Sequence, residues 1–329
     1  MTPETSVIIP TCNRRAMLRE ALASVAAQRG AIFEIIVVDD GSTDGTWEDL
    51  SCGGDDIRAV RTERRGPAAA RNRGIAIARG ALIAFLDSDD LWMAAKLARQ
   101  SRFMRDNPDC AIAQTGETWM RGGRRVNPGR RHRKRAGDIF IDSLRTCLIS
   151  PSAAILRRAL FDEVGSFDED MAACEDYDLW LRIVARHEAG LLDEPLTIRR
   201  AGHPGQLSAT VAALDRFRIL ALAKLLGDGS LSAGRRAAAA EVMAEKCLVY
   251  GKGLARRGHH DAAAFFGDTA RSALARWTHT PDAALEAARA TMREMLKSQE
   301  KSVISTYTGV RQDPDPQAAR RSAYRLRHR

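Results

Sequence analysis

The 329-residue sequence lacks the features of a membrane-spanning chain or a disulfide-stabilised fold. No apolar run reaches the length that a transmembrane helix needs. The first residues lead directly into a strand-like run, so we expect no signal peptide. The six cysteines are scattered, without the Cys-x-x-Cys spacing of a zinc site, and nothing indicates a disulfide framework. A reducing, cytoplasmic location is therefore expected.

Two phosphate-binding motifs are also missing. The turn after the first strand-like run has no Gly-x-Gly-x-x-Gly, and no Gly-Lys-Ser/Thr loop occurs. If a nucleotide binds, its phosphates therefore need a metal ion and basic side chains. Aromatic residues make up only 5% of the chain and do not alternate with basic residues. Since no nucleic-acid-binding motif is present either, we expect no nucleic-acid partner.

The net charge of +9 is concentrated in two basic clusters, 121–135 and 320–329. Basic clusters attract phosphates and anionic lipid surfaces. For the second cluster two interpretations stay open: a solvated surface, or peripheral contact with the inner face of a membrane.

Strand-like and helical patterns alternate through the first part of the chain. Apolar runs predict strands at 6–10, 34–38, 57–61 and 83–86, and helical spacing predicts helices at 16–28, 46–50 and 66–80. This alternation predicts an α/β fold with a parallel sheet and right-handed crossovers. Beyond it we expect a helix over 91–107, a mobile loop up to residue 135 and a last strand at 196–200.

Three carboxylates directly follow the strand at 83–86. On an extended chain Asp87 and Asp89 share one face and Ser88 takes the other. Carboxylate oxygens at the carboxyl end of a strand suit a hard cation, Mn²⁺ or Mg²⁺. A plain acidic turn is the alternative, and capping the next helix is the role predicted for Asp90.

Five sequence blocks in order resemble the family 2 glycosyltransferases: SVIIPTCNR, IIVVDDGSTDGT, GPAAARNRGI, ARGALIAFLDSDDLW and CEDYDLWLRI. The resemblance covers roughly residues 5–210. It implies a GT-A fold, the Rossmann-like fold of nucleotide-diphospho-sugar transferases, with a mostly parallel central sheet flanked by helices. It also implies metal-assisted, inverting transfer of a sugar from a nucleotide-diphosphate donor to a hydroxyl acceptor, such as a glycan or lipid-linked glycan.

Carried over by position, the resemblance implies a donor site and a metal site. The residues implied on the donor side are Pro10, Thr11, Arg14, Asp39, Asp40, Arg71, Asp87 and Ser88. Arg14 and Arg71 would contact phosphates, although either could be an ordinary surface arginine. Asp89 would be the direct metal ligand together with Asp87, and His203 is a further candidate ligand.

The Glu-Asp pair of the last block is implied to hold the catalytic base. Apolar spacing over 177–184 places Asp176 at a helix start, where the helix dipole favours its ionised form. An inverting transfer needs a base for the acceptor proton, and Asp176 is the residue that the resemblance gives this role. A bare capping residue is the alternative. Glu175, Trp180 and Gln206 are expected to orient the acceptor or support the site.

The composition changes after about residue 211 and predicts three regions: a catalytic domain at 1–210, an α-helical extension at 211–301 and a basic, disordered tail at 302–329. Helices at 241–258 and 261–274 resemble a helical hairpin, which needs a neighbour to bury its apolar face. The oligomeric state stays open.

Two other functions remain open at this point. A metal-dependent nucleotidyltransferase could use the same sheet and metal, and a non-catalytic sugar-binding module could be built on the same fold. The basic cluster at 121–135 lies where the family has its acceptor side, so it would suit an anionic acceptor.

Overall fold

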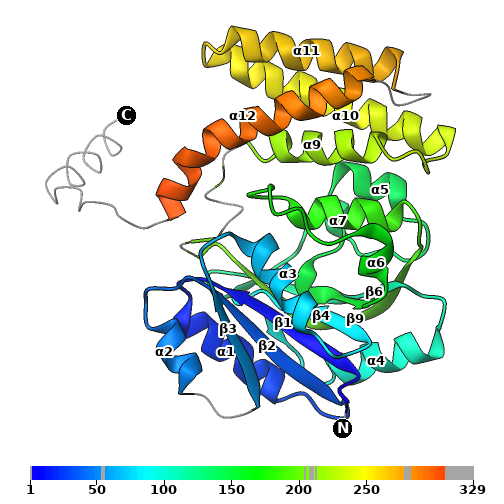
Figure 1. Ribbon diagram of the computed structural model, residues 1–329. Coiled ribbons are helices and arrows are strands. Elements are labelled where there is room, and N and C mark those ends of the chain that lie inside the picture. The colour runs from blue at the N-terminus through cyan, green and yellow to red at the C-terminus, as the bar shows by residue number, and fades with distance from the viewer. Residues whose placement is uncertain are drawn as a thin grey trace, which may run out of the picture.

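The computed structural model describes residues 2–52, 56–203, 205–206, 211, 213–277 and 283–307, and for 298–307 the backbone alone. A central sheet has helices on both faces, and further helices form a separate layer above it (Figure 1). This arrangement confirms the α/β fold with a C-terminal helical region.

The strands are β1 (Thr5–Thr11), β2 (Phe33–Asp40), β3 (Ile57–Thr62), β4 (Leu82–Phe85), β5 (Leu91–Trp92), β6 (Ile112–Arg121), β7 (Arg124–Val126), β8 (Ala154–Arg157) and β9 (Ala189–Ala201). Their order in the sheet is β3-β2-β1-β4-β8-β6-β9-β5, with β7 paired to β6. From β3 to β4 neighbouring strands are parallel. Beyond β4 the sheet is mixed, because β8 is antiparallel to β4 and β6, whereas β9 is parallel to β6.

The helices are α1 (Arg15–Ala26), α2 (Thr46–Ser51), α3 (Pro67–Ile77), α4 (Lys96–Asp106), α5 (Phe140–Arg145), α6 (Leu160–Val164), α7 (Glu175–Val184), α9 (Asp215–Leu226), α10 (Ala233–Arg256), α11 (His260–Ala275) and α12 (Ala283–Tyr307). Two 3₁₀ turns, η1 (Arg130–His132) and η2 (Pro151–Ala153), complete the described elements.

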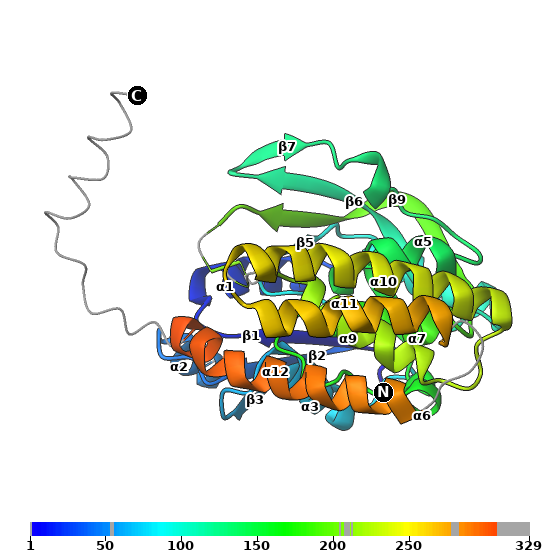
Figure 2. The same cartoon turned by 90° about the horizontal axis from the view of Figure 1, so that it is seen from above.

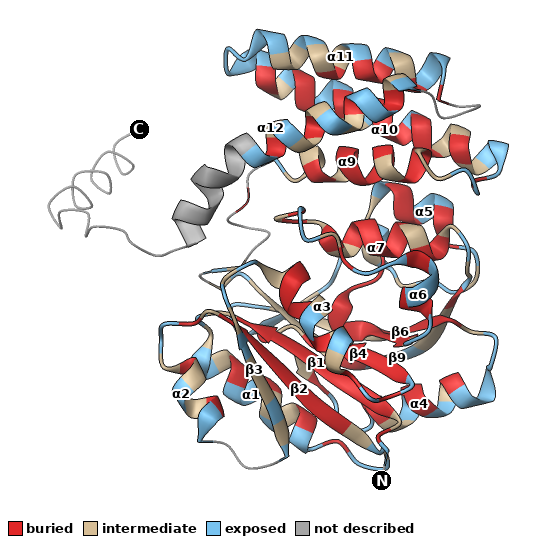
Figure 3. Ribbon diagram, viewed as in Figure 1, coloured by how far each residue is buried: buried red, intermediate tan, exposed pale blue. Residues whose placement is uncertain are grey.

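The central strands are buried on both faces, as their continuous apolar runs predict. Ile8 of β1 belongs to the apolar core cluster that includes residues of α3 and α7, whereas its neighbours Val7 and Ile9 belong to the cluster on the α1 and α4 side. Alternating side-chain directions along a strand explain this division. Figure 3 shows the result as nearly unbroken burial along β1, β2 and β4.

Two local expectations were wrong. The segment expected to start a helix at residue 91 forms strand β5, and helix α4 begins only at Lys96. Pairing with β9 overrides the local helical pattern, because Leu91 and Trp92 lie opposite Ile198 and Thr197. The basic cluster at 121–135 is also more than a loop, since it contains β7 and η1.

The predicted helical hairpin is present as α10 and α11. Tyr250 and Phe266 pack edge to face between them, with ring centroids 4.8 Å apart. Helices α9 and α12 supply the neighbours that the hairpin needs, and α9 in turn packs on α7. Seen from above, these helices lie over α3, α7 and the sheet, with β6, β7 and β9 emerging beside them (Figure 2).

The boundaries expected for this region stay predictions, with one exception. Helix α12 continues past residue 302 to Tyr307, so the expected tail does not begin where the composition suggested. The remainder of the tail, 308–329, lies outside the described residues. In the part of the chain that the structure describes, no helix is both long and apolar enough to span a membrane.

An ionic cluster joins the helical layer to α7 and the segment before it. Lys224 of α9 places its Nζ 2.6 Å from an oxygen of Asp168 and 2.7 Å from Oδ1 of Asp178 on α7. Arg182 neutralises the other oxygen of Asp178 at 2.8 Å. Asp178 is fully buried, so its charge depends on these two cations.

Replacing Lys224 by Met should therefore destabilise the whole chain. The substitution leaves the carboxylate of Asp178 with one cation instead of two, and we expect the free energy of unfolding to fall by about 3 kcal/mol. Urea denaturation would measure the change. Lys252→Met, at an exposed position of α10, is the matched control and should change the free energy by less than about 0.5 kcal/mol. Equal losses in both variants would contradict this role of Lys224.

Candidate active site

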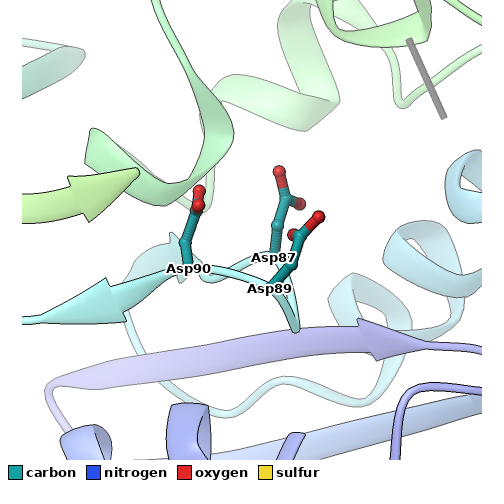
Figure 4. A group of neighbouring side chains, drawn as sticks. All are labelled: Asp87, Asp89 and Asp90. Carbon is teal, nitrogen blue, oxygen red and sulfur yellow. The ribbon is translucent and has the colours of Figure 1, made fainter. Parts of the chain in front are cut away.

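The carboxylates that follow β4 project from a tight turn rather than from an extended strand. The amide of Asp90 donates to the carbonyl oxygen of Asp87 at 2.9 Å, which closes the turn. One oxygen from each of Asp87, Asp89 and Asp90 lies within 4.8 Å of the others. Figure 4 shows the carboxylates of Asp87 and Asp89 side by side, with Asp90 turned to the same side. The turn therefore gathers three carboxylates where the strand pattern predicted two.

Asp90 is not the helix cap that the sequence suggested. One of its oxygens accepts a hydrogen bond from Ser152 Oγ at 2.7 Å, and the other accepts the Arg200 amide at 2.8 Å. The Ser152 hydroxyl also accepts the Asp87 amide at 3.1 Å, so one serine of η2 supports both ends of the acidic turn. Burial, followed by the charges of Asp89 and Asp87, raises the pKa of Asp90 well above its ordinary value.

Asp89 collects basic side chains from two distant segments. Arg14, which precedes α1, lies 3.0 Å from its Oδ2, and His203 Nε2 lies 2.9 Å from the same oxygen. Arg14 also donates to the Gly205 carbonyl at 2.8 Å. Gln206 accepts the Gly202 amide at 2.8 Å and so closes the turn that carries His203. Arg14, His203 and Gln206 were each named from the sequence: the structure brings the first two to the acidic turn, and Gln206 to the turn that carries His203.

Arg71 joins the acidic turn to the start of α7. Its Nη2 lies 2.7 Å from Oδ1 of Asp87, and its Nη1 lies 2.7 Å from Oε1 of Glu175. The guanidinium is buried and lies 5.3 Å from the centroid of the Phe167 ring. Burial and the charge of Asp176 raise the pKa of Glu175, against the lowering effect of Arg71. Arg71 is therefore a bridge between two carboxylates, a role more specific than that of a surface arginine.

Asp176 stands next to this bridge at the first turn of α7. Its Oδ1 accepts the Tyr177 amide at 2.7 Å, and the thiol of Cys147 lies 3.6 Å from its Oδ2. Burial and then the charge of Asp176 raise the pKa of Cys147 well above its ordinary value, so this thiol stays protonated and can donate. Cys174, the residue before α7, has a φ of 61°, a conformation that costs a non-glycine residue about 1 kcal/mol or more.

The predicted donor residues at the ends of β1 and β2 are buried. The hydroxyl of Thr11, next to Pro10, has no hydrogen-bond partner among the described residues. Asp39 accepts the Ser42 amide at 3.2 Å and lies 3.3 Å from Arg61 Nε, a residue that the sequence did not single out. An unpaired buried hydroxyl at the carboxyl end of a parallel strand is what a ligand-binding position offers.

Asp40, predicted to contact the sugar donor, instead accepts hydrogen bonds from backbone amides. Its two oxygens accept the amides of Arg65 and Gly66, each at 2.8 Å, and they hold the loop that leads into α3. Burial raises the pKa of this carboxyl against the lowering effect of those two bonds. Its contact with a donor stays a prediction.

Two further predicted residues lie behind the site. Trp180 is 2% exposed and packs edge to face on Phe167, the ring beneath Arg71. Through Phe167, Trp180 supports the position of Arg71, and its own side chain is buried beneath the site. Ser88, at the tip of the acidic turn, is 1% exposed.

A polar cluster on β6 and the basic segment was not foreseen. Lys134 Nζ lies 3.0 Å from Oε1 of Glu117, and Ser150 donates to the same oxygen. The indole of Trp119 donates to Oε2 of Glu117 at 2.8 Å. Although burial alone would raise it, Lys134 and Arg199 hold the pKa of Glu117 below its ordinary value. No local motif could reveal this cluster, because its members come from separate segments of the chain.

The sequence profile described as Glycosyl transferase family 2 matches residues 6–165. An uncharacterised glycosyltransferase of Rickettsia felis is 36% identical over 196 residues, which cover 59% of this chain and 32% of that protein. The chain thus spans about a third of the length of this relative. An Escherichia coli protein, UDP-Glc:alpha-D-GlcNAc-diphosphoundecaprenol beta-1,3-glucosyltransferase WfgD, is 32% identical over 184 residues, covering 54% of this chain and 69% of that one.

Solved structures confirm the fold. S. aureus TarS 1-349 in complex with UDP-GlcNAc superimposes with a TM-score of 0.64 at 21% identity, over 91% of this chain and 92% of that one. A mannosyltransferase from Pyrobaculum calidifontis, in complex with GDP-Man and Mn²⁺, gives a TM-score of 0.55 at 20% identity, over 92% of this chain and 88% of that one. At these identities the likeness shows the GT-A fold alone.

The arginine bridge gives a direct test of the site's architecture. Arg71→Met should lower the free energy of unfolding by about 3–5 kcal/mol, because it leaves two carboxylates without their shared cation. The matched control is Arg102→Met, which breaks an ion pair with Asp106 on the exposed face of α4. That control should cost less than about 1 kcal/mol. Chemical denaturation measures both, and similar losses would show that the bridge is dispensable.

Proposed function

The chain belongs to glycosyltransferase family 2, and we propose that it transfers a sugar from a nucleoside-diphosphate donor to a hydroxyl acceptor. The observation that carries this proposal is the Arg71 bridge. It brings the acidic turn, with Asp87 and Asp89, next to the helix start that bears Asp176. A donor diphosphate bound at the turn would then have its anomeric carbon near a candidate base.

The acidic turn suits a divalent metal ion, Mn²⁺ or Mg²⁺. It offers oxygens from Asp87, Asp89 and Asp90 within 4.8 Å of one another, and hard cations prefer such ligands. Burial, and after it the charges of Asp89 and Asp87, raise the pKa of Asp90, and a cation would relieve the repulsion between these carboxylates. When bound, the metal would neutralise charge on the leaving nucleoside diphosphate. The mannosyltransferase of the same fold that contains Mn²⁺ supports this assignment.

Asp89 would hold the metal, with Asp87 and His203 as further ligands. In the structure Oδ2 of Asp89 instead lies 3.0 Å from Arg14 and 2.9 Å from Nε2 of His203. Because Arg14 also reaches the carbonyl of Gly205, it can remain beside the turn and face a donor phosphate. Pro10, Thr11 and Asp39 would contact the nucleoside, and the unpaired hydroxyl of Thr11 supports a polar contact there.

Asp176 would accept the proton of the acceptor hydroxyl as that oxygen attacks the anomeric carbon. Direct attack inverts this carbon without a covalent enzyme intermediate. The backbone amide of Tyr177 and the thiol of Cys147 fix the orientation of the Asp176 carboxylate. Glu175 stays paired with Arg71 and so positions Asp176 from the neighbouring residue.

We place the acceptor among lipid-linked glycans at the inner face of the membrane. The E. coli relative is named for transfer to a GlcNAc diphosphate lipid. The basic cluster at 121–135 gives this chain the positive charge that an anionic acceptor requires. A nucleotidyltransferase is the alternative with the same metal, and its product would be pyrophosphate. Release of nucleoside diphosphate on incubation with UDP-, GDP-, dTDP- and CDP-sugars would decide for sugar transfer.

Donor binding should depend on the metal and on Asp89. A nucleotide sugar that binds only the native state raises the melting temperature, and we expect this rise in the presence of Mn²⁺ and its loss after EDTA treatment. Asp89→Asn should abolish the Mn²⁺-dependent part of the rise. Asp106→Asn, at an exposed position of α4, is the control and should leave the shift intact. A full shift in Asp89→Asn would remove Asp89 from the metal site.

Asp176→Asn should separate binding from transfer. The amide cannot take the acceptor proton, so we expect transfer to fall by about 10²–10⁴-fold. The donor-induced melting shift should persist, because Asp176 does not contact the donor in this proposal. Product formation measured by chromatography, beside the thermal shift, checks both parts. Near-normal turnover would mean that another residue is the base.

A further inference from the structure

Arg199 of β9 is a positively charged residue that interacts electrostatically with Asp90 of the acidic turn and with Asp176 of α7. It lies directly opposite Trp119 in the β6–β9 pairing, and its guanidinium carbon is 4.7 Å from the centroid of the indole ring. His132 of η1 lies on the same indole, with ring centroids 5.1 Å apart. The aromatic ring thus attracts the guanidinium without using its hydrogen-bond donors.

Although the backbone of Arg199 pairs with β6, its guanidinium makes no hydrogen bond or ion pair within the part of the chain that the structure describes. Burial opposes its charge, but Glu117, Asp90 and Asp176 together raise its pKa, so it remains a cation. Glu117 interacts with Arg199 through its charge but not as an ion pair, and its two oxygens accept from Lys134, Ser150 and Trp119. A partly exposed, fully charged guanidinium with free donors is a binding group for an anion.

The position of Arg199 assigns this anion to the acceptor rather than to the donor. The next residue of β9, Arg200, meets the acidic turn, because its amide donates to Asp90 and its side chain donates to the Asp89 carbonyl. Side chains alternate along a strand, so Arg199 faces the opposite way and lies over Trp119 instead. Arg199 also interacts electrostatically with Asp176, the proposed base. It contacts the same indole ring as His132, which belongs to the basic cluster at 121–135. Figure 2 shows β6, β7 and β9 emerging together on one side of the helical layer.

We propose that Arg199, whose guanidinium lies over the Trp119 ring, binds a phosphate group of the acceptor. The proposal rests on the proposed sugar transfer and makes its substrate more specific: a saccharide that carries phosphate close to the accepting hydroxyl. The guanidinium fork matches two phosphate oxygens at once, which a single ammonium group does not. Lys134 is not part of this subsite, because Glu117 and the Leu148 carbonyl occupy its ammonium group.

The test compares two acceptors that differ only in phosphate: N-acetylglucosamine linked to a short alkyl chain through a diphosphate, and the same sugar as a plain alkyl glycoside. Arg199→Gln should raise the KM of the diphosphate acceptor by about ten-fold or more, which narrows the KM difference between the two acceptors. Arg199→Lys should restore only part of this loss. Arg102→Gln, which removes a positive charge from the exposed face of α4, should leave the KM ratio of the two acceptors as in the wild type.

Three results would overturn the proposal. The first is an equal rise in the KM of both acceptors, which would make Arg199 a structural residue. The second is a KM increase for the nucleotide sugar as large as that for the acceptor, which would place the bound phosphate on the donor. The third is an unchanged KM ratio in Arg199→Gln.

A binding measurement separates this proposal from the proposed function. Calorimetric titration of the diphosphate acceptor into Asp176→Asn, and into the same variant with Arg199→Gln added, requires no turnover. Weaker binding after the second substitution supports the phosphate subsite even if the wild type transfers no sugar, a result that would defeat the proposed function alone. Equal binding by the two proteins, or no binding by Asp176→Asn, would reject the subsite.

Discussion

The site depends on one guanidinium that two carboxylates share. Asp87 follows the last of the parallel strands, and Glu175 begins a helix that comes much later in the chain. Their like charges would repel each other at this separation, and burial would make that repulsion costly. The positive charge of Arg71 lies between the two carboxylates and attracts both of them. The acidic turn and the start of α7 are therefore held together through Arg71.

The sequence predicted what local patterns encode. Apolar runs located the parallel strands, and the motif blocks singled out Asp87, Asp89 and Asp176. The roles of these residues remain proposals, whereas the fold and the family are confirmed. The mixed half of the sheet was not predictable in the same way. Strand β5 carries a helix-like pattern but pairs with β9, and such long-range pairing leaves no periodicity in the chain.

The supporting contacts escaped prediction for a related reason. Ser152 is an ordinary serine in a proline-containing turn, yet its hydroxyl holds Asp90 and Asp87 together. Arg199 was assigned only to a strand, since nothing in its neighbours indicates that Trp119 will lie opposite. In each case the chemistry arises from a register between distant segments. Sequence patterns identify reactive groups more readily than the groups that orient them.

The helical layer is continuous with the core around the sheet, and this has a consequence for folding. A single apolar cluster includes Phe85 of the sheet, Leu179 of α7, Leu220 of α9 and Leu285 of α12. Lys224 adds ion pairs across the same contact. Separating the helices from the sheet would expose these apolar side chains to water, so we expect the two parts to fold as one unit.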